Sequence, residues 1–362
     1  MSTISLCMIV RNEEQVLRCC LDSICSLVDE ILIADTGSTD LTKEIAKDYT
    51  EKIWDFPWID DFSAARNFII SKARSEYFMW LDADDCLPAE QASSFSRLKE
   101  ELSPQTDMVL LPYHTGFDSL GRPAFSCVRE RLIRNRKGYC FCGRVHEAIP
   151  LSGNVIFRDI PVEHRKKGAS DPERNLKIYQ NMISGGEPFE ARDLYYYGRE
   201  LLDHGDYEKS RNIFRSFLER KDGWAENKMD AVRQLACCSR ALGQEQDILS
   251  ILLTGLSYGV PSGELCCDLG RCFMEQNQYA IAAYWFRQAL LSEKSAASGA
   301  FIQEECYGFY PAISLCVCYD RLGDLENAWK YNELAGTFQP ESPYYLHNKI
   351  YLETSRISVQ IS

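Results

Sequence analysis

Three aspartates, Asp82, Asp84 and Asp85, directly follow the apolar stretch FMWL. In an extended chain, residues i and i+2 point to the same side, so we expect Asp82 and Asp84 to face one ligand while Asp85 points elsewhere. A hard cation such as Mg²⁺ or Mn²⁺ takes one or two protein carboxylates and completes its shell with water and phosphate oxygens. The pattern therefore predicts a metal that bridges a diphosphate. The alternative is a polar turn with a helix-capping acid.

The elements that position these acids alternate between strand and helix patterns. Apolar runs predict strands at residues 3–10, 30–35, 51–56 and 77–81, with helices at 13–26, 41–49 and 63–73 between them. This order predicts a mostly parallel sheet covered by helices. Ligands of such sheets lie at the carboxyl ends of the strands, where Asp35 and Asp82 are found.

The pattern changes after residue 88. A helix is expected at 89–102, a strand at 107–114, a turn at 116–122 and a second strand at 126–135. A turn this short joins antiparallel strands, so this half of the sheet is expected to be mixed or antiparallel.

The region of about residues 3–165 resembles family 2 glycosyltransferases of the GT-A fold, which transfer a sugar from a nucleotide-sugar donor. The resemblance lies in four segments: LCMIVRNEEQVLRCCLDSI, VDEILIADTGSTDLTKEIA, DFSAARNFIISKARSEYFMWLDADD and GRVHEAI. It implies an α/β, Rossmann-like GT-A domain with a mixed sheet, a UDP-sugar donor, and Mg²⁺ or Mn²⁺. With the C-terminal repeats, the chain is most similar to bacterial members such as the sublancin-type peptide S-glycosyltransferases.

The resemblance also implies roles for the matching positions. Asp35 would accept a hydrogen bond from the base, Arg66 would reach the base or the diphosphate, and Asp82 would bind the ribose. Asp84 would bind the metal. The residues expected at the nucleotide sugar are Val10, Arg11, Asn12, Glu13, Asp35, Arg66, Asp82, Ala83 and His146.

Two histidines, His146 and His164, lie near predicted strand ends after the acid cluster. Members of the family often add a downstream histidine to the metal shell, and imidazole suits Mn²⁺. We assign His164 to the metal and His146 to the leaving diphosphate. The alternative for each is a histidine that is hydrogen-bonded within a loop.

The general base is the least defined residue. An inverting transfer by single displacement needs a carboxylate on the acceptor face to take the proton of the nucleophile. Family 2 enzymes usually supply it from a downstream ED pair, which this sequence lacks. We take Glu147 in RVHEAI as the candidate catalytic base, with Glu130 and Asp118 as rivals. A thiol acceptor would need a base less, because thiolate forms near or below pH ~8.5.

The C-terminal half repeats itself. Its segments align on turn residues Gly205, Gly243, Asn277 and Gly323, with spacings close to the ~34-residue period of tetratricopeptide repeats except for the longer last one. Small residues stand seven positions before each turn residue, and Phe214 and Phe286 stand nine positions after two of them. The pattern predicts an all-α tetratricopeptide-like domain. An unrelated helical bundle is the alternative.

These patterns divide the chain into a GT-A domain at 1–165, a linker with a helix at 166–190, repeats at 191–345 and a tail at 346–362. The net charge of −13 argues against nucleic-acid binding through broad electrostatics. No apolar run approaches the ~18–20 residues of a membrane span, and the N-terminal apolar stretch is too short for a signal peptide. We expect a cytoplasmic protein whose sixteen cysteines are mostly reduced core residues.

The leading hypothesis is a metal-dependent, inverting glycosyltransferase that moves a sugar from a UDP-sugar to a peptide or protein acceptor. The repeats would dock that acceptor or build a homodimer. One alternative acceptor is a saccharide or a lipid-linked cell-envelope precursor. Another class of protein, a non-enzymatic repeat scaffold with a degenerate transferase domain, stays open at this point.

Overall fold

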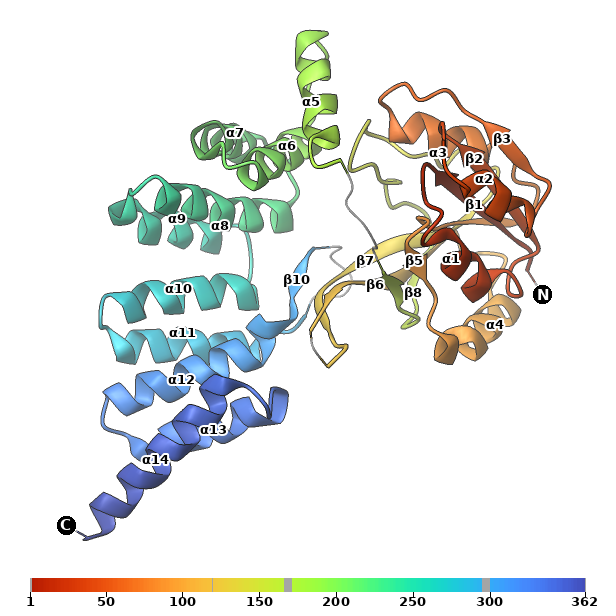
Figure 1. The fold of residues 1–362 in the computed structure, drawn as a ribbon. Coiled ribbons are helices and arrows are strands. Elements are labelled where there is room, and N and C mark those ends of the chain that lie inside the picture. Colours follow the sequence, from red (N-terminus) through yellow and green to blue (C-terminus); the bar gives the residue numbers. More distant parts are fainter. Residues whose placement is uncertain (1, 119, 166–170, 295–299, 362) are drawn as a thin grey trace. The chain divides into compact units, whose positions relative to one another are not determined.

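The computed structural model describes residues 2–118, 120–165, 171–294 and 300–361, and is drawn in Figure 1. The chain forms two compact units. The first runs from Met1 to Pro188, and the second comprises Phe189–Ser295 and Ala300–Ser362.

The first unit is built on one mixed sheet, whose strands follow the order β3-β2-β1-β4-β7-β6-β9-β5, with β8 also paired to β6. Strand β1 is parallel to β2 and β4, whereas β7 is antiparallel to β4 and β6. The expected change from a parallel to an antiparallel half is therefore confirmed. The strands are β1 (Ile4–Val10), β2 (Glu30–Asp35), β3 (Ile53–Asp55), β4 (Tyr77–Trp80), β5 (Asp85–Cys86), β6 (Met108–Phe117), β7 (Pro123–Arg134), β8 (Val155–Phe157) and β9 (Val162–His164).

Helices cover both faces of this sheet because strands β1 and β4 are apolar on both sides. Leu17 and Leu21 of α1 pack in one core with Met79, whereas Ile69 of α3 packs in a second core with Trp80. Successive residues of β4 thus serve opposite faces. The helices of this unit are α1 (Leu17–Ile24), α2 (Thr42–Lys47), α3 (Phe62–Ile70), α4 (Ala92–Glu101) and α5 (Arg174–Ser184).

Helix α1 begins at Leu17, later than the expected start near residue 13. Two side chains that follow β2 in the sequence accept hydrogen bonds from backbone N–H groups that precede α1. Ser38 Oγ accepts from Asn12 (3.0 Å) and Thr42 Oγ1 accepts from Glu13 (2.7 Å). Asn12 itself is left-handed, with φ 57°. These bonds satisfy the backbone outside a helix, so residues 11–13 form a loop at the end of β1.

The segment after β4 returns to the sheet instead of ending in an isolated turn. Strand β5 pairs antiparallel with β9, which places Asp85 opposite His164. Strand β9 is held in turn by β6, in parallel. The acid cluster and a histidine far along the chain are thereby brought together.

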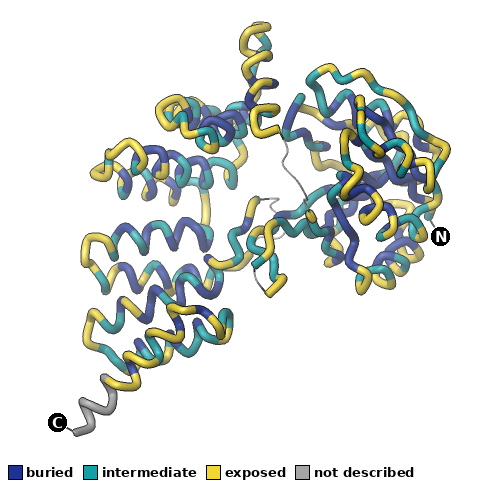
Figure 2. Tube along the Cα trace, in the orientation of Figure 1, coloured by how far each residue is buried: buried dark blue, intermediate teal, exposed yellow. Residues whose placement is uncertain are grey.

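The second unit is a series of antiparallel helix pairs, each with one buried and one exposed side (Figure 2). All four predicted turn residues are left-handed, with φ between 58° and 77°. The short strand β10 (Ile302–Gln303) precedes α12. The helices are α6 (Ala191–Asp203), α7 (Tyr207–Glu219), α8 (Ala225–Ala241), α9 (Ile248–Thr254), α10 (Gly263–Glu275), α11 (Tyr279–Leu291), α12 (Phe309–Arg321), α13 (Leu325–Phe338) and α14 (Pro343–Ile361).

The segment described as a linker with a helix contains α5, and the segment described as a tail is largely helical. Residues 166–170 of the linker lie outside the described part, and the helix that follows starts at Arg174, after Asp171 has accepted a hydrogen bond from the Glu173 N–H (3.0 Å). Most of the predicted tail belongs to α14, because Leu352 is buried against a core with Cys316 and Ala328.

Most cysteines are buried in the cores as thiols, as expected; Cys7, Cys20 and Cys266 are examples. Among the helices of the described residues, none combines the length and hydropathy that a membrane crossing requires.

Candidate active site

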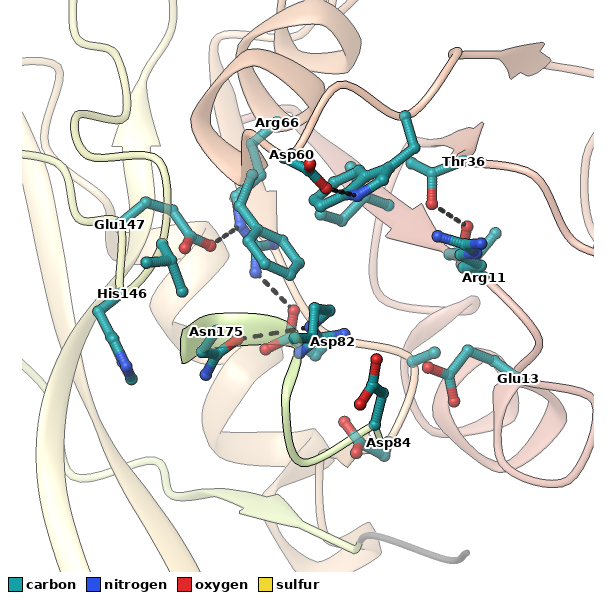
Figure 3. A pocket seen from close by; sticks show the side chains of 18 of the residues that line it. Arg11, Glu13, Thr36, Asp60, Arg66, Asp82, Asp84, His146, Glu147 and Asn175 are labelled. Carbon is teal, nitrogen blue, oxygen red and sulfur yellow. Dashed lines mark hydrogen bonds and ion pairs between the residues drawn. The ribbon is translucent and has the colours of Figure 1, made fainter. Parts of the chain in front are cut away.

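A cavity of about 1010 Å³ opens at the carboxyl ends of β1 and β4. Loops after β1, β3 and β4 form part of its wall, and β7, the 145–147 segment, β9 and α5 complete it (Figure 3). The residues predicted from the sequence that line it are Val10, Arg11, Asn12, Glu13, Arg66, Asp82, Ala83, Asp84, His146, Glu147 and His164. The structure thus gathers nearly the whole predicted set around one cavity.

Asp35 is the predicted residue that is not on the cavity wall. Its carboxylate is buried at the end of β2, where Oδ1 accepts from the backbone N–H groups of Gly37 and Ser38 (2.9 Å each). Its other oxygen, Oδ2, is buried without a hydrogen-bond partner. Because a buried acceptor is normally satisfied, this oxygen is a candidate for a ligand donor.

Arg66 of α3 lies between two acids at the centre of the cavity (Figure 3). Its Nη2 donates to Asp82 Oδ1 and its Nε to Glu147 Oε1, each at 2.6 Å. Its guanidinium also stacks on Trp80, 4.7 Å from the ring centroid. The charge-assisted bonds fix both carboxylates toward the cavity.

Asp84, Asp85 and His164 form a cluster that could hold a metal ion. His164 Nδ1 lies 3.4 Å from Asp84 Oδ1 and 3.5 Å from Asp85 Oδ1. Asp85 is fully buried and already engaged, since Arg131 Nη1 lies 2.9 Å from its Oδ2 and Tyr113 donates to its Oδ1 (2.7 Å). Asp84 is therefore the carboxylate with room for a ligand, and Asp85 is placed to orient its neighbours.

The electrostatics of the two aspartates differ strongly. Burial would raise the pKa of Asp82, but Arg66 and Arg131 outweigh it and lower that pKa to about 2. Burial raises the pKa of Asp84 to about 6, opposed by His164 and reinforced by Asp82 and Asp85. Uncompensated negative charge thus accumulates at Asp84. Carboxylate oxygens with an imidazole nitrogen are donors that suit Mg²⁺ or Mn²⁺, so the residues present fit such an ion.

The three candidate bases are placed differently. Glu147 borders the cavity, although its Oε1 is bound by Arg66. Glu130 is buried away from the wall, with Oε1 accepting from the Ile149 N–H (3.1 Å). Asp118 stabilises the β6–β7 turn by accepting from the Arg122 N–H (2.9 Å). Glu147 is the only one of these three that could approach an acceptor in the cavity.

Several wall residues were not predicted from the sequence. Trp58 and Asp60 come from the loop after β3, and Trp58 Nε1 donates to Asp60 Oδ1 (2.8 Å). Both stand in the motif DFPWIDDF, where dense aromatic and acidic residues could have flagged them. Others are Ile9, Thr36, Phe62, Trp80, Arg129, Val145, Asp171, Arg174, Asn175, Lys177 and Asn181.

The wall also concentrates unusual backbone geometry. Asn12, Asp60 and His146 have φ of 57°, 56° and 51°, in the left-handed region that non-glycine residues rarely adopt. His146 is further fixed by stacking on Tyr179, with ring centroids 6.4 Å apart. Such strain persists where the surrounding structure holds it and is common at functional sites.

Comparisons with known proteins find similarity over part of this chain. Residues 5–124 match the sequence model of the family "Glycosyl transferase family 2". The chain is 37% identical over 149 residues, 41% of its length, to a TPR repeat-containing protein of Synechococcus elongatus. It is 30% identical over 249 residues, 60% of its length, to the SPbeta prophage-derived glycosyltransferase SunS of Bacillus subtilis. It is 29% identical over 164 residues, 42% of its length, to the lipopolysaccharide core biosynthesis glycosyltransferase LpsC of Rhizobium meliloti.

The matched regions span 36%, 56% and 58% of these three relatives' own lengths. The family match covers the strands β1 to β4 that carry the acids, together with the hairpin strand β6. The first unit of the chain therefore contains a glycosyl transferase family 2 domain, followed in the second unit by helical repeats of the tetratricopeptide type.

Proposed function

We propose that this chain is a metal-dependent glycosyltransferase that moves a sugar from a UDP-sugar to a peptide or protein acceptor. The observation that carries the proposal is the meeting of Asp84 with His164 on a cavity wall at the carboxyl ends of the sheet. An anionic oxygen cluster with an adjacent imidazole, beside a large polar cavity, suits a divalent cation and the diphosphate that it would bridge.

In this proposal, different site residues contact the base, the ribose and the diphosphate of the donor. Asp35 Oδ2, buried and without a partner, accepts a hydrogen bond from the base, and residues 10–13 enclose the base from β1. Asp82, held as an anion by Arg66, accepts from the ribose. Asp84 and His164 hold the Mg²⁺ or Mn²⁺, which when bound supplies positive charge for the diphosphate. His146 lies nearer Glu147, toward the leaving group.

Glu147 takes the proton of the acceptor nucleophile in this proposal, and the transfer inverts the anomeric carbon. Its Oε1 stays bound to Arg66, so the proton passes to the carboxylate through its other oxygen. Arg66 thereby orients the base before the acceptor arrives.

The test is turnover of UDP-glucose, UDP-GlcNAc and UDP-galactose in Mn²⁺, measured as release of UDP. We expect activity with at least one donor and a loss of at least roughly tenfold in Asp84→Asn. Asp48→Asn is the matched control, since Asp48 is exposed and paired with Arg18 away from the cavity. Full activity in Asp84→Asn would exclude the metal role. Wild type that neither binds nor turns over any of the donors would instead favour the non-enzymatic scaffold.

Two classes of acceptor are candidates for this transfer: a peptide or protein, and a saccharide. Stacked helix pairs offer a surface for an extended peptide, which favours a peptide or protein acceptor, and the same helices could build a homodimer. The relative that is named for lipopolysaccharide core biosynthesis favours a saccharide acceptor. Transfer assays with labelled donor against a Cys- and Ser-containing peptide library and against glycan acceptors would tell them apart by mass spectrometry.

A further inference from the structure

We infer that Arg174, on helix α5, is a catalytic residue that contacts the β-phosphate of the donor diphosphate. The inference rests on the proposed function and adds to it a cation from outside the matched family region, which ends at residue 124.

Helix α5 is held on the rim of the cavity by its own contacts. Its buried side includes Tyr179, which is fully buried and stacks on His146, and Ile178. Its other side lines the cavity through Arg174, Asn175, Lys177 and Asn181. Asn181 Nδ2 donates to Asp60 Oδ2 at 3.4 Å, so the helix is tied to the loop after β3.

Arg174 is a cation of this cavity that is not committed to a carboxylate. Its guanidinium stacks on Phe62, 4.7 Å from the ring centroid, and its Nε donates to Asn175 Oδ1 (3.4 Å). It forms no ion pair with any residue of the described ranges. Arg66, by contrast, is bound to two carboxylates. A stacked guanidinium without an anion is pre-oriented for an anionic ligand.

The position of Arg174 favours the diphosphate over the base. The next residue, Asn175, is drawn beside Asp82 in Figure 3, whereas Arg11, the other cavity arginine without an ion pair among the described residues, lies beside Thr36. The charge of Arg174 also reaches Glu13: burial and the neighbouring Asp84 and Asp82 raise the pKa of Glu13 to about 7, and Arg174 opposes that rise. Arg174 thus lies near Glu13, whose pKa also responds to Asp82 and Asp84 after β4.

The chemistry of transfer calls for such a cation. As the bond between the sugar C1 and the β-phosphate oxygen breaks, its electron pair stays on that oxygen. The acceptor nucleophile forms the new bond to C1 and gives its proton to Glu147. The diphosphate gains one negative charge, and a guanidinium fork that binds two phosphate oxygens stabilises that charge more in the transition state than before.

The experiment compares binding of UDP and UMP, in Mn²⁺, by calorimetry. UMP lacks the β-phosphate. We expect Arg174→Gln to weaken the affinity for UDP by about tenfold or more and to leave the affinity for UMP within about twofold of wild type. The UDP affinity of Arg174→Lys should lie between those of wild type and Arg174→Gln. Arg18→Gln, which removes an exposed arginine that stacks on Tyr49 away from the cavity, should change neither affinity.

Three outcomes would overturn the inference. Unchanged UDP affinity in Arg174→Gln would remove the contact while leaving the proposed function intact, because wild type would still bind UDP. An equal loss of UDP and UMP would show that Arg174 supports α5 or the base instead of the β-phosphate. Wild type that binds neither nucleotide would refute the proposed function, and this inference with it.

Discussion

Arg66 shows how single residues organise this site. Its side chain is 7% exposed, and its guanidinium bridges Asp82 and Glu147 and lies over Trp80. Removing one partner of such a buried set leaves an unpaired, desolvated charge. This typically destabilises the fold by more than the net contribution of the ion pair to stability. The same residue therefore fixes the geometry of the site and is part of the stability of the first unit.

Glu30, at the start of β2, gives a pH-dependent prediction outside the site. It accepts from Ser5, from Lys52 Nζ (2.6 Å) and from the Arg74 N–H (2.8 Å). Burial would raise its pKa, but these donors lower it from 4.5 to about 2. A depressed pKa contributes stability that is complete above the unfolded value and is lost as the pH falls toward the folded value.

We expect Glu30→Gln to lower the free energy of unfolding by about 2 kcal/mol at neutral pH, with the difference from wild type shrinking between pH ~5 and ~3. Urea titrations at several pH values measure this. Glu51→Gln, at an exposed position beside Lys52, is the control and should stay close to wild type throughout. A Glu30→Gln deficit that is independent of pH would contradict the account.

At the scale of elements, close helix packing in the repeats depends on small residues. A Cβ at Gly198 would lie 2.8 Å from the Phe214 ring, and one at Gly270 would meet the Phe286 ring at the same distance. The repeat alignment had singled out these four residues by their fixed offsets from the turn, and the structure shows that they meet in pairs. Two helices of a repeat can therefore approach at these points.

We expect Gly198→Ala to destabilise the second unit by about 1–3 kcal/mol, although alanine is ordinarily the better helix former. Denaturant unfolding followed by helical circular dichroism measures the effect. Phe214→Leu in the same chain should restore part of the loss, and the single Phe214→Leu variant completes the double-mutant cycle. A Gly198→Ala chain more stable than wild type would show that the helices do not touch there.

The elements themselves were largely predictable, and the site only in part. Periodic apolar patterns identified β1, β2, β4 and the repeat turns because each depends on local sequence. The start of α1 was missed because Ser38 and Thr42, distant in sequence, capture the backbone before it. The contact between Arg66 and Glu147 joins residues 81 apart, and α5 reaches the cavity through packing that no local pattern encodes. Loop residues such as Trp58 belong to no periodic pattern, so their position on the cavity wall could not be predicted from periodicity.

At the scale of the whole molecule, the chain forms two compact units. Every residue that lines the cavity belongs to the first unit. The family match also falls there, whereas the second unit consists mainly of paired helices. The cavity and the helix pairs thus belong to separate parts of the chain.

Hydrogen exchange tests this division. We expect UDP with Mn²⁺ to slow exchange at residues 10–13, at 82–86 and in α5, and to leave α6 to α13 unchanged, since a ligand protects the parts of the native state that it contacts. Mn²⁺ without UDP is the control for the nucleotide. Protection that is equal in both units would mean that the donor site is not confined to the first.

The most direct measurement for the central claim is anomalous scattering at the manganese edge from a crystal of this chain grown with UDP and Mn²⁺. We expect one manganese peak within ligand distance of Asp84 and His164, with the diphosphate beside it and the uracil near Asp35. A manganese peak on other residues, or UDP bound outside this cavity, would contradict it.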